Sequence, residues 1–61
     1  MSDSQIAKII MALNNLSGAR ALLNDAVKEG GDIAATLSPL LEMIKSCEDE
    51  LRIIQHQKGN S

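Results

Sequence analysis

The sequence predicts an all-α fold, an antiparallel helical hairpin that dimerises into a four-helix bundle. Two long segments carry apolar residues at alternating steps of three and four, and a glycine pair at 30–31 separates them. More apolar residues remain than one hairpin can cover. The whole chain, residues 1–61, is therefore expected to be a single helical-hairpin domain that acts with a partner.

The first helix is expected over residues 3–29. Ser2 and Gln5 match the capping box, and Asp3 places a negative charge in the first turn, at the positive end of the helix dipole. The expected inner seam consists of Ile6, Ile9, Leu13, Leu16, Arg20, Leu23 and Val27. Alanines flank this seam at an interval of seven, which allows a neighbouring helix to approach closely: Ala12, Ala19 and Ala26.

The second helix is expected over residues 32–58, after a Gly-Gly turn that ends the first helix and with Asp32 as its N-cap. Its predicted seam consists of Ile33, Leu37, Leu40, Ile44, Cys47, Leu51 and Ile54. Pro39 leaves two alternatives. Either the helix is kinked there, which the unbroken phase of the seam favours, or it is interrupted and restarts with Ser38 as a cap.

The surplus apolar residues predict a further interface. With one cysteine and no aromatic residue, a chain of this length lacks the usual means of stabilising a small domain alone. A second hairpin is the expected partner, and a helix of another protein is the alternative occupant. The residues expected at this interface are Ile10, Leu41, Met43, Arg20, Ala12 and Ala19.

An outward ridge on the first helix and Arg20 each allow two interpretations. Met11, Gly18 and Leu22 form an outward ridge that is either a second contact site or a set of ordinary exposed apolar residues. Arg20 either packs its stem in the seam, with its guanidinium at the edge, or contacts an acidic partner, since no acid of this chain is expected opposite it. Cys47 is expected to be buried on the seam.

No pattern in the sequence predicts catalysis. Glu48, Asp49 and Glu50 are consecutive and therefore point in different directions around a helix, and Cys47 and His56 have no further ligand to complete a metal site. The chain is therefore not expected to be an enzyme or to hold a cofactor or metal. One free thiol, no export signal and no membrane-spanning run make the cytoplasm the expected location.

The expected plan resembles the Rop family of plasmid copy-number regulators, hairpin dimers that bind paired RNA loops, in architecture and length. The resemblance implies an alternative function in binding RNA or another nucleic acid. Lys8, Arg52 and Lys58 are the candidate phosphate contacts, because all three are expected at the end of the hairpin that holds the termini. The net charge of −2 and the lack of aromatic residues argue against this alternative.

The helix, Gly-Gly-Asp, helix layout is also similar to the small hairpin chaperones of type III secretion. That similarity implies a groove that holds a helix of a partner protein. The function expected first is nevertheless that of a small non-enzymatic protein-interaction module, an adaptor, regulator or chaperone that acts as a homodimeric four-helix bundle.

Overall fold

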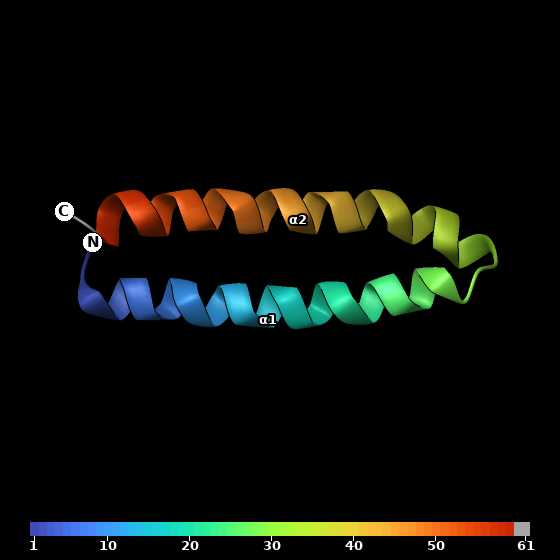
Figure 1. The fold of residues 1–61 in the computed structure, drawn as a ribbon, viewed down its shortest axis with the longest axis horizontal. Helices are drawn as coiled ribbons and strands as arrows, with labels where there is room; N and C mark the ends of the chain where they lie inside the picture. The colour runs from blue at the N-terminus through green and yellow to red at the C-terminus, as the bar shows by residue number, and fades with distance from the viewer. Residues whose placement is uncertain (60–61) are drawn as a thin grey trace.

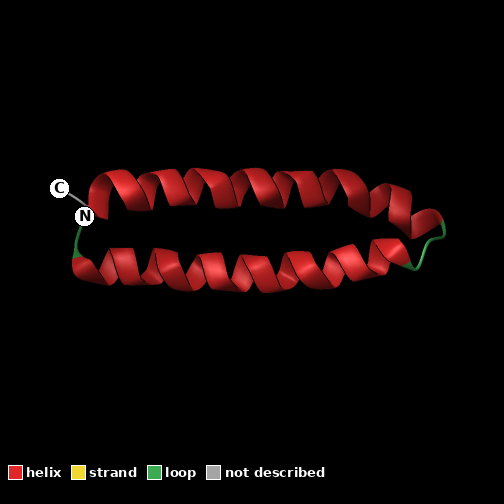
Figure 2. Ribbon diagram, viewed as in Figure 1, coloured by secondary structure: helices red, strands yellow, loops and turns green. Residues whose placement is uncertain are grey.

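The structure is a pair of long helices lying side by side. A computed structural model describes residues 1–59, and the side chains of residues 1–57. Helix α1 spans Asp3–Lys28 and helix α2 spans Asp32–Gly59, and the two run antiparallel along a body of 46 × 15 × 11 Å (Figure 1). The described residues contain no strand (Figure 2), so the predicted all-α class is confirmed.

Helix α1 begins at the predicted capping box. The backbone N–H of Gln5 donates to Ser2 Oγ at 3.1 Å, and the backbone N–H of Ser2 donates to Gln5 Oε1 at 2.9 Å. These two bonds satisfy N–H groups that the first helical turn leaves without partners. The predicted inner seam of α1 is also confirmed, because all seven of its residues are buried or half-buried, Leu13 most completely.

The connection between the helices consists of Glu29, Gly30 and Gly31. Both glycines adopt left-handed backbone conformations, with φ of 85° and 81°, which residues with a Cβ rarely adopt. Because α1 ends at Lys28 and α2 begins at Asp32, residues of the two helices whose numbers add to about 60 lie level with one another. This relation is the register that the connection implies for the hairpin.

Helix α2 runs through Pro39 without interruption, so the alternative in which the helix restarts at Ser38 is wrong. Its first turns bend toward α1 (Figure 1). Pro39 is exposed and lacks an N–H, and Ser38 Oγ donates to the carbonyl of Ala34 at 2.9 Å. A proline on the solvent side of a helix is tolerated because the resulting bend curves the helix toward its neighbour.

The inner face of α2 differs from the predicted one. Within residues 32–57, the buried or half-buried residues of α2 are Ala34, Leu37, Leu41, Ile44, Glu48, Leu51 and Gln55. Only Leu37, Ile44 and Leu51 belong to the predicted seam. Ile33, Leu40 and Ile54 are instead 56%, 44% and 39% exposed, and Cys47 is exposed rather than buried.

The physical reason is that α2 carries two apolar stripes that share these three residues. Rotation toward Leu41 and Glu48 gives the half-buried Arg20 a carboxylate partner, and a charge at a seam position is costly without one. Rotation toward Leu40 and Cys47 would turn Glu48 out of the seam and away from Arg20.

Candidate protein-interaction surface

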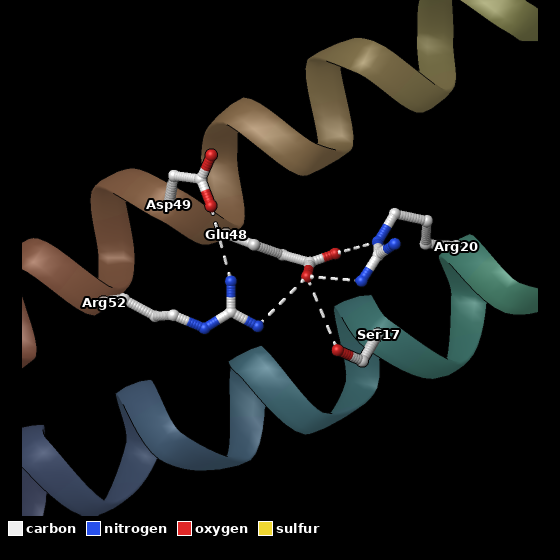
Figure 3. Close-up of polar contacts among 5 residues, drawn as sticks. All are labelled: Ser17, Arg20, Glu48, Asp49 and Arg52. Atoms are coloured by element: carbon white, nitrogen blue, oxygen red, sulfur yellow. Dashed lines mark hydrogen bonds and ion pairs between the residues drawn. The ribbon is translucent and has the colours of Figure 1, made fainter.

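A group of polar side chains centred on Glu48 joins the two helices (Figure 3). The Arg20 Nε–H donates to Glu48 Oε1 at 2.7 Å, and Arg20 Nη2 donates to Glu48 Oε2 at 3.2 Å. Ser17 Oγ and Arg52 Nη2 each donate to Glu48 Oε2 at 3.4 Å, and Arg52 Nη1 donates to Asp49 Oδ1 at 3.5 Å. The Glu48 side chain is 1% exposed, so this carboxylate is buried but fully partnered.

The expectation that no acid lies opposite Arg20 is therefore wrong. Arg20 lies level with about residue 40 of α2, two helical turns from Glu48. Side chains on a helix lean toward its N-terminus, and in an antiparallel pair Arg20 and Glu48 lean toward each other. The pair could have been identified from the sequence by combining two facts. The connection sets which residues lie level, and helical side chains lean toward the N-terminus of their helix.

The ion pair changes the proton affinity of both partners. Hydrogen bonding by the Arg20 guanidinium holds the pKa of the Glu48 carboxyl below its ordinary value, against the opposing effect of desolvation. The Glu48 carboxylate in turn raises the pKa of Arg20. A carboxylate that accepts hydrogen bonds from three side chains is a poor general base, so this group is suited to fixing the helix register rather than to proton transfer.

The two broad sides of the hairpin can be assigned from helical geometry. Successive residues advance by about 100° around each axis, and the two axes point in opposite directions. Residues that directly precede the inward-facing residues Leu13 and Arg20 in α1 therefore share a side with those that precede Leu41 and Glu48 in α2. The bonds from both Ser17 and Arg52 to one oxygen of Glu48 agree, because both donors belong to the opposite side.

The first of these sides is apolar. Helix α1 contributes a stripe of alanines, and α2 contributes a parallel stripe of large residues and the cysteine. We call these seven residues the apolar side: Ala12, Ala19, Ala26, Ile33, Leu40, Cys47 and Ile54. Beneath them, the half-buried residues nearest this side are also all aliphatic: Ile9, Leu16, Leu23, Leu37, Ile44 and Leu51. The apolar side is therefore a surface with the aliphatic composition of a protein core.

The second side is mostly polar. It carries one aliphatic residue, Ile10, and five polar or basic ones, and we call these six residues the polar side: Ile10, Ser17, Asn24, Ser38, Lys45 and Arg52. Glu48 and its partners lie along this edge of the seam. Ile10 is 41% exposed, close to the 44% of Leu40, so each side offers an aliphatic residue of similar exposure.

The residues predicted at the interface are divided among several locations. Ala12 and Ala19 belong to the apolar side, and Met43 lies at its rim with 66% exposure. Ile10 lies on the polar side, and Leu41 is half-buried between the helices rather than at a flank. The remaining predicted residue, Arg20, pairs with Glu48.

The predicted outward ridge is also divided. Met11 and Gly18 face away from α2, and a Cβ at Gly18 would meet no atom within 4 Å. Leu22 is 73% exposed and lies at the rim of the apolar side. The three residues therefore do not form one continuous surface.

The candidate phosphate contacts do not gather into one patch among the described side chains. The guanidinium of Arg52 is engaged by Glu48 and Asp49. Lys8 is exposed and, from the helical phase, lies at the rim of the apolar side, whereas Arg52 belongs to the polar side. The side chain of Lys58 lies outside the described residues.

Among residues 1–57 there is no group of three or more His, Cys, Asp or Glu side chains that could hold a metal ion, and no pocket. None of the helical residues described forms a stretch both long and apolar enough to cross a membrane. The chain matches no known protein family, and neither a curated protein nor a solved structure is detectably similar to it.

Proposed function

We propose that this chain is a small non-enzymatic protein-interaction module, an adaptor, regulator or chaperone, that acts as a homodimer. In this dimer the apolar sides of two hairpins meet and form a four-helix bundle. The observation that carries the proposal is that Ile33, Leu40, Cys47 and Ile54 are all exposed, at intervals of seven, beside a stripe of alanines.

The free energy of burial supports this proposal. Moving a large aliphatic side chain out of water is favourable by about 1.5 to 3 kcal/mol. The hairpin buries Glu48 and half-buries Gln55 in its own seam while Leu40 and Ile54 remain exposed. This distribution is unfavourable for an isolated hairpin and favourable for one whose apolar side is covered by a partner.

The size of the apolar side is also suitable. The broad side of the hairpin measures 46 × 15 Å between backbone extremes, a footprint of about 700 Å² before side-chain relief is counted. Standard protein interfaces bury about 800 Å² on each partner. The polar side, in contrast, carries Lys45 and Arg52, which suit contact with solvent.

Sedimentation velocity of the purified chain, from about 1 to 100 μM, tests the proposal. We expect a helical dimer at micromolar concentration, with a monomer appearing only on dilution. A chain that is fully helical by circular dichroism and monomeric throughout this range would refute the homodimer. A chain that is poorly helical alone, and becomes helical when a host protein is added, would show instead that the apolar side holds a helix of that protein.

A further inference from the structure

We propose that the two hairpins pair with their connections at the same end, so that α2 of each copy packs on α1 of the other. This inference rests on the proposed homodimer and adds the orientation of its two chains. In this arrangement the stripe of large residues on each copy meets the alanine stripe of the second copy. The second copy is therefore the occupant that the apolar side fits.

Two closed arrangements bring the apolar sides of two copies together. A two-fold axis along the helices places α1 over α2 and leaves both connections at one end. A two-fold axis across the helices places α1 over α1 and α2 over α2, with the connections at opposite ends. The stripes of the apolar side distinguish the two, because one stripe is small and the other is large.

The level of each residue favours the first arrangement. A two-fold axis along the helices keeps every residue at its own level, so Leu40 lies opposite Ala19 of the second copy, because 40 and 19 add to about 60. Cys47 lies opposite Ala12, and Ile33 lies opposite Ala26, by the same relation. Ile33, Leu40 and Cys47 of one copy thus each meet an alanine of the other, at three successive levels, whereas Ile54 lies opposite Gln5 beyond the alanine stripe.

Side-chain direction improves this fit. The Leu40 side chain leans toward the N-terminus of α2, and the alanine methyl groups lean the other way. The end of Leu40 therefore falls between Ala19 and Ala26 of the second copy, and Cys47 falls between Ala12 and Ala19. This is knobs-into-holes packing, in which a side chain of one helix inserts between side chains of its neighbour.

The rim of the apolar side adds a second match. Leu22 and Met43 are 73% and 66% exposed, and both lie at this rim. When α1 of one copy lies over α2 of the other, the backbone of Leu22 in one copy is about five residues along the helix axis from that of Met43 in the other. The two side chains lean toward each other along this axis. The same geometry brings Arg20 to Glu48 within one hairpin. The arrangement therefore covers two of the most exposed apolar residues of the chain.

The second arrangement lacks this complementarity. It would place the large stripes of both copies together and the alanine stripes of both copies together. The two α2 helices would then be held apart by Ile33, Leu40 and Ile54, while the α1 helices could approach closely only if the hairpins tilted. Leu22 and Met43 would also lie over different helices, so neither would reach the other.

Pulsed electron paramagnetic resonance distances between spin labels test the orientation. The labels are placed on a cysteine introduced at the connection, E29C, or at the opposite end, S4C, each in a C47A chain. Circular dichroism and sedimentation first establish that each variant is a helical dimer. We expect a distance of about 20 Å in the E29C dimer, since neighbouring helices lie about 8 to 10 Å apart and each label adds its own length.

A mixture of E29C and S4C chains provides the matched measurement. Labels at opposite ends of the bundle are separated by about 40 Å, the length of a 26-residue helix. We expect this long distance between the E29C and S4C chains, with the short distance within each single variant. The reverse pattern would overturn the proposed orientation and leave the dimer intact. The absence of any distance between chains, with monomers in sedimentation, would refute the dimer itself.

Discussion

The apolar side and the polar side of this hairpin flank the same inner seam, but they differ in how well their side chains are paired or covered within one chain. On the polar side, the buried carboxylate of Glu48 is enclosed by Arg20, Arg52 and Ser17, and every oxygen that water would have contacted has a protein donor. On the apolar side, Leu40 and Ile54 stay exposed although the neighbouring seam residues are aliphatic. The buried polar groups along the polar side are therefore paired within one chain, whereas large aliphatic residues of the apolar side stay exposed to solvent.

This difference explains the rotation of α2. One isolated hairpin can cover only one of the two apolar stripes of α2, and pairing Arg20 selects the stripe that contains Glu48. The second stripe remains free to contact another chain. The buried ion pair thus accounts for which apolar residues of α2 stay exposed, and under the proposed homodimer these are the residues that contact the second copy.

The largest expected effect is on association. Leu40→Glu places a charge at the centre of the apolar side, and we expect the dissociation constant of the dimer to rise on the order of 100-fold. Ile10→Glu is the matched control, because Ile10 has similar exposure on the polar side. It should change the dissociation constant less than about 3-fold. If sedimentation equilibrium gave the same dissociation constant for both variants, the apolar side would not be the dimer interface in preference to the polar side.

The next effect concerns stability on the polar side. Arg20→Leu leaves the buried Glu48 with only its weaker partners, so we expect a lower midpoint of thermal unfolding than for any substitution at an exposed position. Arg20→Leu combined with Glu48→Leu removes both charges and should recover most of the loss. Circular dichroism melting curves measure both. A double variant as unstable as Arg20→Leu would show that packing by Arg20, not its charge pairing, holds this edge.

Acid should also lower the midpoint of thermal unfolding, by protonating Glu48, but by less than Arg20→Leu does. Because the pKa of Glu48 is lower in the folded chain than in the unfolded one, its contribution is fully present above the ordinary glutamate pKa. That contribution is lost as the pH falls through the lowered value. We expect Glu48→Gln to reduce the pH dependence of the unfolding midpoint below the ordinary glutamate pKa. A variant with the unchanged pH dependence of the parent chain would contradict this account.

The smallest effects are expected at two glycines that lie on neither side. Gly18 is in the helix interior with open space around its Cβ position, so Gly18→Ala should stabilise the chain by up to about 1 kcal/mol. Gly30 has a φ of 85°, so Gly30→Ala should destabilise it by about 1 to 2 kcal/mol. Chemical denaturation measures both. Loss of association in Gly18→Ala would show that the outward face of α1 is a contact site after all.

Much of the fold was predictable because local signals agreed with one another. The capping box at Ser2 and Gln5, the seam of α1, and the exposed position of Pro39 all follow from spacing and residue type. The seam of α2 was not predictable by counting apolar residues. Two stripes with the same period competed there, and the less apolar one was selected by a charge pair between distant positions.

The candidate surface was predictable only in part for the same reason. The alanine stripe signals close helix packing whatever the rotation of α2. Ala12 and Ala19 lie on the apolar side, and their place in an interface stays a prediction. Leu40 and Cys47 were placed in the seam and Leu41 at the flank, which reverses their positions. A shift of one position along a helix turns a residue by about 100°, enough to exchange core and surface.

The reactivity of the Cys47 thiol tests most directly whether the apolar side is covered in solution. Cys47 is exposed in the single hairpin, and in the proposed dimer it lies against Ala12 and Ala19 of the second copy. A chain with Lys45→Cys and Cys47→Ala presents a thiol on the polar side as the control. We expect the alkylation rate of Cys47 to fall as the protein concentration is raised through the dimer dissociation constant. The control thiol should react at the same rate at every concentration. Equal rates for both thiols at every concentration would contradict the account.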